Sequence, residues 1–240
     1  MNLETASTFT DNKVLAALSP KDFALLEPHL EPVSLDVKQV LEAPNKLIKH
    51  SYFLNHGLAS VIAIGKNGHR LEVGLIGREG MTGLPVVTGN DRSPNETFVQ
   101  VQGHGSRINA EELRGAIRES RSLHNVLLKF VHDFLILTAH TALSNGTASA
   151  EQRLARWLLM AQDRLGGDEV PLTHEFLSLM LGIRREGVTV ALNALKRKGL
   201  IRLMRGCIQI ADRRGLITAA NGSYGVPEAA AKRNGSKATR

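Results

Sequence analysis

The sequence predicts an α+β fold in which a small β-roll, a long helix and a winged helix-turn-helix follow one another. Short β-prone runs separated by turn residues fill residues 33–110, a pattern typical of a small barrel or roll. Apolar residues then repeat at helical spacing over residues 123–144. Two further helical segments and a β-hairpin follow, and this succession is typical of a winged helix-turn-helix.

The composition indicates a globular chain without a membrane anchor. Of the 240 residues, 42% are hydrophobic, which is enough for the cores of two modest domains. Uninterrupted apolar runs of about 18 residues are absent, so we expect no membrane span and no membrane partner. The N-terminus lacks the basic start and apolar stretch of a secretory signal. The single cysteine, Cys207, makes neither an intramolecular disulfide nor a metal cluster. We therefore expect a cytoplasmic protein and no metal site.

Positive charge is concentrated in the second part of the chain. Residues 148–240 hold 16 of the 30 Lys and Arg residues but only 8 of the 23 acidic residues. This asymmetry is typical of a segment that meets a polyanion, although a basic solvated surface with a basic tail gives the same count. The tail itself, residues 223–240, is rich in Ala, Gly, Lys and Ser and is expected to be disordered.

The first domain, residues 1–121, contains a clear hairpin signal. Ala59–Ile64 and Arg70–Leu75 are β-prone, and Asn67-Gly68 between them supplies the positive φ of a tight turn. Before the strands, Ser19-Pro20 predicts a helix start, with serine as the cap and proline in the first turn.

The long helix, residues 122–147, carries two apolar stripes. The first has the alternating spacing of a heptad repeat, and we assign it to a dimer interface formed by Leu123, Leu127, Phe130, Phe134, Leu137 and Thr141. The second stripe lies to one side and consists of Leu128, Val131, Leu135 and Thr138. One stripe is expected to face the β-roll and the other a second copy of the chain. A single wide face buried within a monomer is the alternative.

Residues 148–222 have the sequence form of a winged helix-turn-helix. Thr173 is the predicted cap of the first helix, Gly182 lies in a short turn, and a hairpin follows the second helix. In such a domain the first turn of the second helix enters the major groove. Its outward residues, expected to read bases, are Arg184, Arg185, Glu186, Thr189 and Val190. The residues placed to contact the DNA backbone are Thr173, His174, Lys196, Arg197, Arg202 and Arg205.

The order of these parts resembles the cyclic-AMP receptor protein/FNR (Crp/Fnr) superfamily of bacterial transcription regulators over roughly residues 14–215. The resemblance is most specific at "LTHEFLSLMLGIRREGVTVALNALKRKGLI". The base-reading Arg-Glu pair of the family falls on Arg185-Glu186, whereas its later base-reading arginine falls on Val190. The resemblance implies a cyclic-nucleotide-binding-like β-roll (jelly roll), a homodimer on a near-palindromic site in double-stranded DNA, and contact with RNA polymerase. A different preference is expected at the base pair that faces Val190.

The effector of such a regulator is not evident from the sequence. The positions that match the cyclic-AMP motifs of the family hold Gly83, Leu84, Asn95 and Glu96, without the family's ribose-binding glutamate or its arginine. Glu96 would repel a cyclic phosphate, so cyclic AMP is not expected as the effector and no cofactor is predicted. The single cysteine excludes an iron–sulfur cluster held by several cysteines. Two alternatives stay open: an unknown small-molecule effector, or a constitutive regulator whose β-roll is only a platform for dimerisation and polymerase contact.

Enzyme motifs are absent from the sequence. It contains no Gly-x-Ser-x-Gly elbow, no P-loop and no HExxH, which are the local patterns that place a nucleophile, a phosphate or a zinc ion. We therefore do not expect an enzyme.

Overall fold

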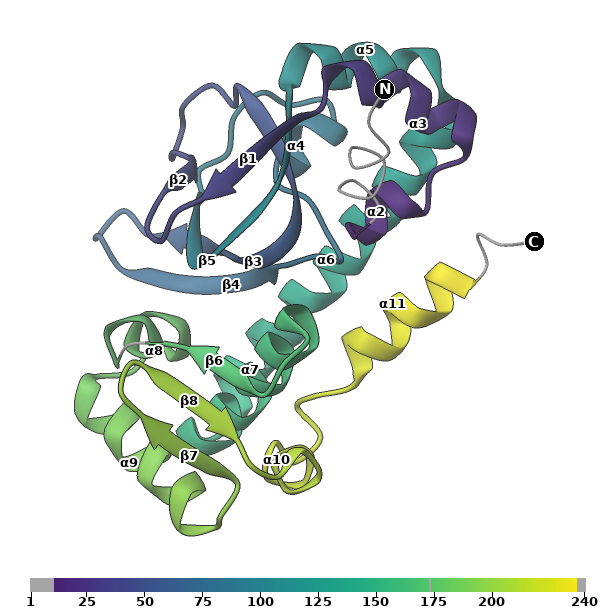
Figure 1. Cartoon of the computed structure of the whole chain (residues 1–240). Helices are drawn as coiled ribbons and strands as arrows, with labels where there is room; N and C mark the ends of the chain where they lie inside the picture. The colour runs from purple at the N-terminus through teal and green to yellow at the C-terminus, as the bar shows by residue number, and fades with distance from the viewer. Residues whose placement is uncertain (1–10, 173, 237–240) are drawn as a thin grey trace.

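The computed structural model describes residues 11–172 and 174–236, which form three successive parts (Figure 1). A domain built on a sheet comes first, and the long helix α6 (Arg121–Thr147) follows it. A smaller domain of helices around a second sheet lies at the far end of α6. The predicted α+β order of β-roll, long helix and winged helix-turn-helix is confirmed.

The first domain opens with short helices and continues as one antiparallel sheet. The helices are α2 (Lys13–Ala16) and α3 (Pro20–Leu26), followed by the 3-10 turn η1 (Glu27–His29). The strands are β1 (Glu31–Leu35), β2 (Val40–Glu42), β3 (His50–Ile64), β4 (Arg70–Ile76) and β5 (Glu96–Asn109). Their order in the sheet is β1-β5-β3-β4, and β2 also pairs with β5. Helix α4 (Leu84–Val87) lies between β4 and β5, and α5 (Ala110–Glu119) connects β5 to α6.

The local signals predicted for this domain are confirmed. The side chain of Ser19 caps α3 by accepting a hydrogen bond from the backbone N of Asp22 (3.1 Å). Strands β3 and β4 pair from Ala59 opposite Ile76 to Ile64 opposite Arg70. Gly68 has a φ of +79° in the turn that joins them, a conformation that glycine adopts without strain.

The first apolar stripe of α6 is buried inside the protomer. Its five large side chains are each at most 9% exposed: Leu123, Leu127, Phe130, Phe134 and Leu137. Phe130 and Phe134 lie against Gly80 and Gly74 of the β-roll, where any Cβ would collide with the two rings. Thr141 is half-buried and donates a hydrogen bond to the carbonyl O of Leu137 (2.9 Å). The prediction that this stripe forms the dimer interface is therefore wrong.

The second stripe of α6 stays on the surface of the protomer. Leu128 is 38% exposed and Leu135 is 62% exposed, while Val131 and Thr138 are half-buried. A heptad rhythm identifies an apolar face, but it does not say whether the same chain or a second chain covers that face. The glycines at positions 74 and 80 decide this, because they let the aromatic stripe sit directly on the β-roll backbone.

Helix α6 is also long and apolar enough, by length and composition alone, to cross a membrane. The core helix of a soluble protein passes the same test, and a single helix of this kind is weak evidence for a membrane span. The aromatic face of α6 packs on the β-roll of its own chain, as the face of a core helix does.

The second domain packs helices around a small sheet. Its helices are α7 (Ala150–Leu165), α8 (His174–Leu181), α9 (Arg185–Arg197) and α10 (Arg213–Ala219). Its strands are β6 (Glu169–Pro171), β7 (Ile201–Met204) and β8 (Cys207–Ile210), in the sheet order β6-β8-β7. Helix α7 begins with a capping box, in which Ser149 and Gln152 each bind the backbone N of the other residue. This box separates α7 from the end of α6.

The described part of the C-terminal tail contains a helix, whereas the tail was expected to be disordered. Helix α11 (Val226–Ser236) runs back along α6 (Figure 1). Asn234 donates from Nδ2 to Oδ1 of Asp133 on α6 (2.6 Å), and Ala230 is buried. Glu228 accepts from the backbone N of Gly225 at the start of the helix (2.9 Å). Composition suggested disorder because the segment has few large apolar residues, but alanines favour a helix once a partner surface is present.

A buried acid joins the two domains. Glu72 on β4 is 4% exposed and accepts a hydrogen bond from the indole N of Trp157 on α7 (2.8 Å). Burial raises the pKa of Glu72 to about 7, against the opposing effect of hydrogen bonds from Ser60 and Trp157. The unfolded chain releases this proton near the ordinary pKa of 4.5. The folded state therefore loses stability as the pH rises from about 4.5 to about 7.

We predict that Glu72→Gln stabilises the protein above pH 7 and changes little at pH 4.5. Glutamine keeps an oxygen for the Trp157 indole but carries no charge, so the stability otherwise lost over this pH range, on the order of 3 kcal/mol, is retained. Urea unfolding between pH 4.5 and pH 8 measures the difference. Glu119→Gln, which removes an exposed carboxylate, is the control and should follow the wild type. Parallel pH curves for Glu72→Gln and the wild type would contradict the assignment.

Candidate nucleic-acid interface

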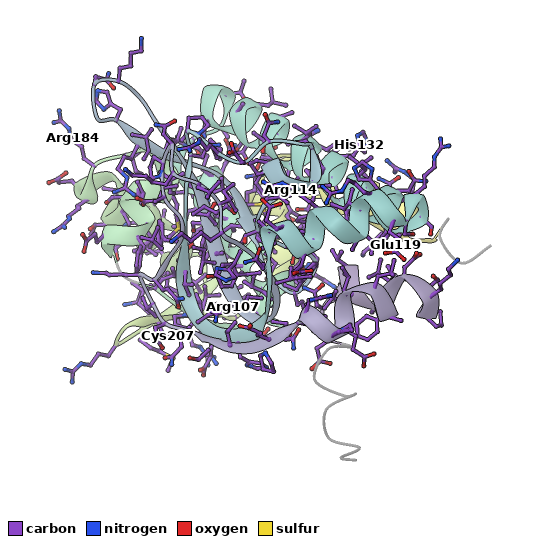
Figure 2. All side chains as sticks on the ribbon, turned by 90° about the horizontal axis from the view of Figure 1, so that it is seen from above. Arg107, Arg114, Glu119, His132, Arg184 and Cys207 are labelled. Atoms are coloured by element: carbon purple, nitrogen blue, oxygen red, sulfur yellow. The ribbon has the colours of Figure 1, made fainter. Side chains whose placement is uncertain are left out.

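Helix α9 has one buried face and one exposed face. Its buried residues, which pack into the domain core, are Val188, Ala191, Leu192 and Leu195. The five predicted base-reading residues are all exposed around its N-terminal half: Arg184, Arg185, Glu186, Thr189 and Val190. Figure 2 shows the side chain of Arg184 at the edge of the molecule, directed away from it. The structure therefore brings the predicted readers together on one free surface.

The arginine at the start of α9 does not cap the helix with its side chain. Arg184 is the N-cap residue, with extended backbone and no side-chain capping bond. The first N–H groups of the helix thus lack a side-chain acceptor, and they add to the positive potential of the helix start. Gly187 faces the turn, where a Cβ would come within 3.3 Å of Cδ1 of Ile183. This part of the helix is therefore positively charged and closely packed on its inner side.

The turn before α9 is held by a residue that the sequence analysis missed. Helix α8 ends at Leu181, and Gly182 follows with a φ of +61°. Arg153 on α7 donates from Nη1 to the carbonyl O of Leu181 (2.8 Å), and this bond caps the C-terminus of α8. Its only signal in the sequence was an arginine within the amphipathic pattern of α7.

Helix α8 also touches the β-roll. The ring of Phe176 on α8 stacks on Phe98 of β5, with 6.0 Å between centroids. Nearby, Gln100 of β5 donates from Nε2 to Sδ of Met180 (3.2 Å). The helix-turn-helix is therefore docked on the first domain through α8, while α9 points outward.

The predicted backbone-contacting residues lie around the end of α9 and on the hairpin. Lys196, Arg197, Arg202 and Arg205 are exposed. Helix α9 ends at Arg197, Gly199 follows with a φ of +72°, and the backbone N of Leu200 donates to Leu195 O (3.1 Å). Gly206, with a φ of +71°, turns the hairpin between β7 and β8. Thr173 and the side chain of His174 lie outside the described residues, so these two predictions are not placed.

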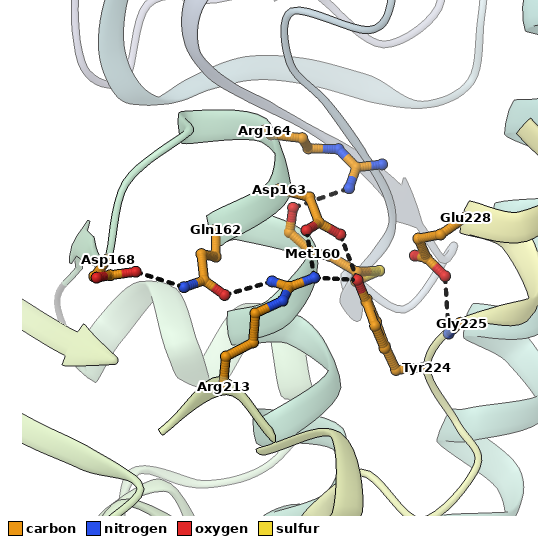
Figure 3. Close-up of polar contacts among 9 residues, drawn as sticks. All are labelled: Met160, Gln162, Asp163, Arg164, Asp168, Arg213, Tyr224, Gly225 and Glu228. Atoms are coloured by element: carbon orange, nitrogen blue, oxygen red, sulfur yellow. Dashed lines mark hydrogen bonds and ion pairs between the residues drawn. The ribbon is translucent and has the colours of Figure 1, made fainter. Parts of the chain in front are cut away.

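A polar network attaches α10 to α7 (Figure 3). Arg213 on α10 donates to Oδ1 of Asp163 (2.7 Å) and to the hydroxyl of Tyr224 (2.8 Å). The Tyr224 hydroxyl in turn donates to Oδ2 of Asp163 (2.6 Å). Burial, together with the neighbouring Asp163 carboxylate, raises the pKa of Tyr224. The network holds the segment between α10 and α11 against the DNA-binding domain.

Comparison with known proteins assigns this architecture. FixK2 from Bradyrhizobium japonicum is 16% identical, with a TM-score of 0.69 over 79% of this chain and 96% of that one. A CRP-family regulator from Thermus thermophilus is 16% identical, with a TM-score of 0.68 over 80% of this chain and 98% of that one. A CRP/FNR-family regulator from the same organism is 23% identical, with a TM-score of 0.65 over 80% and 100%. These likenesses establish the fold.

A sequence model of the Crp-like helix-turn-helix domain matches residues 152–219. The matched segment extends from α7 to α10, and the solved structures with the same fold include proteins described as CRP-family and CRP/FNR-family transcription regulators. No curated protein matches the sequence at a significant level. The family model therefore identifies a Crp-like helix-turn-helix in the second domain.

Three of the four β-roll positions predicted for an effector, Gly83, Asn95 and Glu96, make contacts within the protein itself. The backbone N of Gly83, which precedes Leu84 and α4, donates to Oε1 of Glu42 (2.7 Å). Glu42 is 7% exposed, and burial raises its pKa although hydrogen bonds to the carboxylate oppose the shift. Glu96 pairs with Arg70, and the backbone N of Asn95 donates to Oγ of Ser93 (3.0 Å). Sequence reasoning missed Glu42, whose position 41 residues before Gly83 carries no local signal.

Arg92, three residues before Asn95, is the arginine closest in sequence to the predicted effector position. It is exposed, and it donates from Nη1 to the carbonyl O of Asn45 (3.1 Å). Among residues 11–172 and 174–236, no group of three or more His, Cys, Asp or Glu side chains lies together that could hold a metal ion.

Proposed function

We propose that this chain is a Crp/Fnr-type transcription regulator that binds a near-palindromic site in double-stranded DNA as a homodimer, with the start of α9 in one major groove per protomer. The observation that carries the proposal is the joint exposure of five readers: Arg184, Arg185, Glu186, Thr189 and Val190. An arginine donates two hydrogen bonds to guanine, and a glutamate accepts one from cytosine. Val190, which is 67% exposed, offers only an apolar contact, such as one with a thymine methyl group.

Phosphate contacts would surround this reading surface. Lys196 and Arg197 are exposed at the end of α9, and Arg202 and Arg205 are exposed on the hairpin. Such contacts fix the position of the protein on DNA and make the affinity depend on salt. Two protomers would place their readers about one helical turn of DNA apart.

The dimer would form through the second stripe of α6. Leu128, Val131, Leu135 and Thr138 have the heptad spacing of a two-helix interface, and Leu135 is 62% exposed in the protomer. The first stripe is already buried on the β-roll. A second copy of the chain, related by a two-fold axis, would bury the second stripes against each other.

Control by cyclic AMP is not part of the proposal. The buried carboxylate of Glu42 already accepts the N–H of Gly83, and Glu96 adds a negative charge at the matching position of β5. This arrangement supports either a different small-molecule effector or the constitutive alternative, in which the β-roll is a platform for dimerisation and RNA polymerase. Because its proposed target is DNA, we also propose that the protein acts in the cytoplasm.

Arg185→Ala tests the function. Removing the guanidinium should weaken binding to the preferred site, identified by selection from a random DNA pool without added ligand, by at least about tenfold. Salt-sensitive non-specific binding should persist, because the phosphate contacts remain. Gel shifts on the selected and scrambled sites measure both effects, and added cyclic AMP should change neither. Arg118→Ala on α5, also exposed, is the matched control. Equal specificity of Arg185→Ala and the wild type would overturn the proposal.

Val190→Arg tests the reading of one base pair. The position is exposed, so the stability should stay within about 0.5 kcal/mol of the wild type. Selection from a random pool should show guanine newly preferred at one position in each half-site, with the rest of the consensus unchanged. An unaltered consensus would show that Val190 does not face a base.

Leu135→Glu tests the dimer. A charge at this exposed position should leave the fold intact but convert the dimer to a monomer, as measured by sedimentation. Leu47→Glu, at a β-roll leucine that is 50% exposed, should remain dimeric. Leu127→Glu, at a fully buried position of the first stripe, should unfold the protomer instead. A monomeric wild type that stays monomeric on DNA would contradict the dimer.

A further inference from the structure

A cavity of about 490 Å³ lies between α6 and the C-terminal segment. Its volume is within the range of pockets that hold small molecules. The apolar part of its lining consists of Val14, Leu75, Val126, Phe130, Phe134 and Leu137. The cavity shares none of its lining with Gly83 or Glu42 and is therefore separate from the β-roll position discussed above.

The acidic side chains around the cavity have bonding partners among the described residues, whereas three of its basic side chains do not. Its acids are already engaged. Glu79 forms an ion pair with Arg164, whereas Asp163 accepts a hydrogen bond from Arg213, Asp133 from Asn234, and Glu228 from the backbone N of Gly225. The ammonium groups of Lys13, Lys129 and Lys232 have no hydrogen bond or ion pair with any described residue. The cavity therefore combines an apolar floor with three cations that are free to meet an anion.

The walls of the cavity come from every part of the chain. Lys13 and Val14 belong to α2, Leu75 belongs to β4, and the two aromatic rings belong to α6. The DNA-binding domain contributes Asp163 and Arg164 on α7 and Arg213 on α10. Tyr224 and α11 close one side. A molecule in this cavity would touch the β-roll domain, the long helix and the DNA-binding domain at once.

We propose that this cavity binds an amphipathic carboxylate, with its apolar body on the Phe130–Phe134 floor and its carboxylate among Lys13, Lys129 and Lys232. An apolar body gains by leaving water for such a floor, and a carboxylate forms charge-assisted hydrogen bonds with ammonium groups. The importance of the site for regulation rests on the proposed DNA-binding function, whereas the binding itself does not.

Calorimetric titration of the full chain with decanoate, kept below the concentration at which it forms micelles, tests the proposal. Decanoate should bind at one site per protomer, and 1-decanol, which has the same chain without the charge, should bind about tenfold or more weakly. The double substitution Lys129→Gln and Lys232→Gln should weaken decanoate binding about tenfold and leave decanol binding unchanged. Lys66→Gln, an exposed lysine of the β3–β4 turn, is the matched control and should bind as the wild type does.

A filling substitution separates this cavity from other apolar surfaces. Ala231→Trp adds a ring from an exposed position of α11 that lines the cavity, so it should fold and lose both ligands. Thermal melting and gel shifts on the same samples report folding and DNA binding independently of the ligand. Absence of decanoate binding to the wild type, or equal affinity in the wild type, the double variant and Ala231→Trp, would overturn the site even where DNA binding is normal.

Discussion

The packing of two phenylalanines of α6 on two glycines of the β-roll is the contact on which the rest of the structure depends. Gly74 and Gly80 leave space that the rings of Phe134 and Phe130 fill, with no room for a further carbon. The rings bury a large apolar area and fix which side of a 27-residue helix faces the sheet. Once that side is set, the orientation of every other side chain of α6 is also set. The second stripe then faces outward, and another side faces α11.

The DNA-binding domain follows from the same helix. Helix α6 ends at Thr147, and the capping box of Ser149 and Gln152 starts α7. Helix α7 then returns to the β-roll through the bond between Trp157 and the buried acid Glu72. Phe176 and Phe98 add a second contact between the domains. These contacts bury the inner helices and leave the start of α9 and the hairpin facing outward, which is the arrangement that a groove-reading helix requires.

The helix-turn-helix could be predicted because its signals are local. The cap position at Arg184, the left-handed Gly182 and Gly199, and the inward register of Val188 and Leu195 are each set within a few residues of chain. The dimer stripe could not be assigned in the same way. Two stripes of α6 share one rhythm, and the choice between them depends on Gly74 and Gly80, which lie about 50 residues earlier in the chain. Glu42 and Arg153 were missed because their partners, Gly83 and Leu181, are also distant in sequence.

The sequence by itself determined the order of the three parts, the reading helix with its exposed arginines, and the poor match to a cyclic-nucleotide pocket. These features depend on periodicity, turn residues and residue types, which act over short distances along the chain. Only the tertiary structure decided which stripe of α6 is free, that the tail folds into α11, and that a cavity with three free lysines lies beneath it. Each of these depends on surfaces that meet from distant parts of the chain, and the alanines of α11 show this most clearly. They favour a helix weakly when isolated, but the surface of α6 gives that helix a partner.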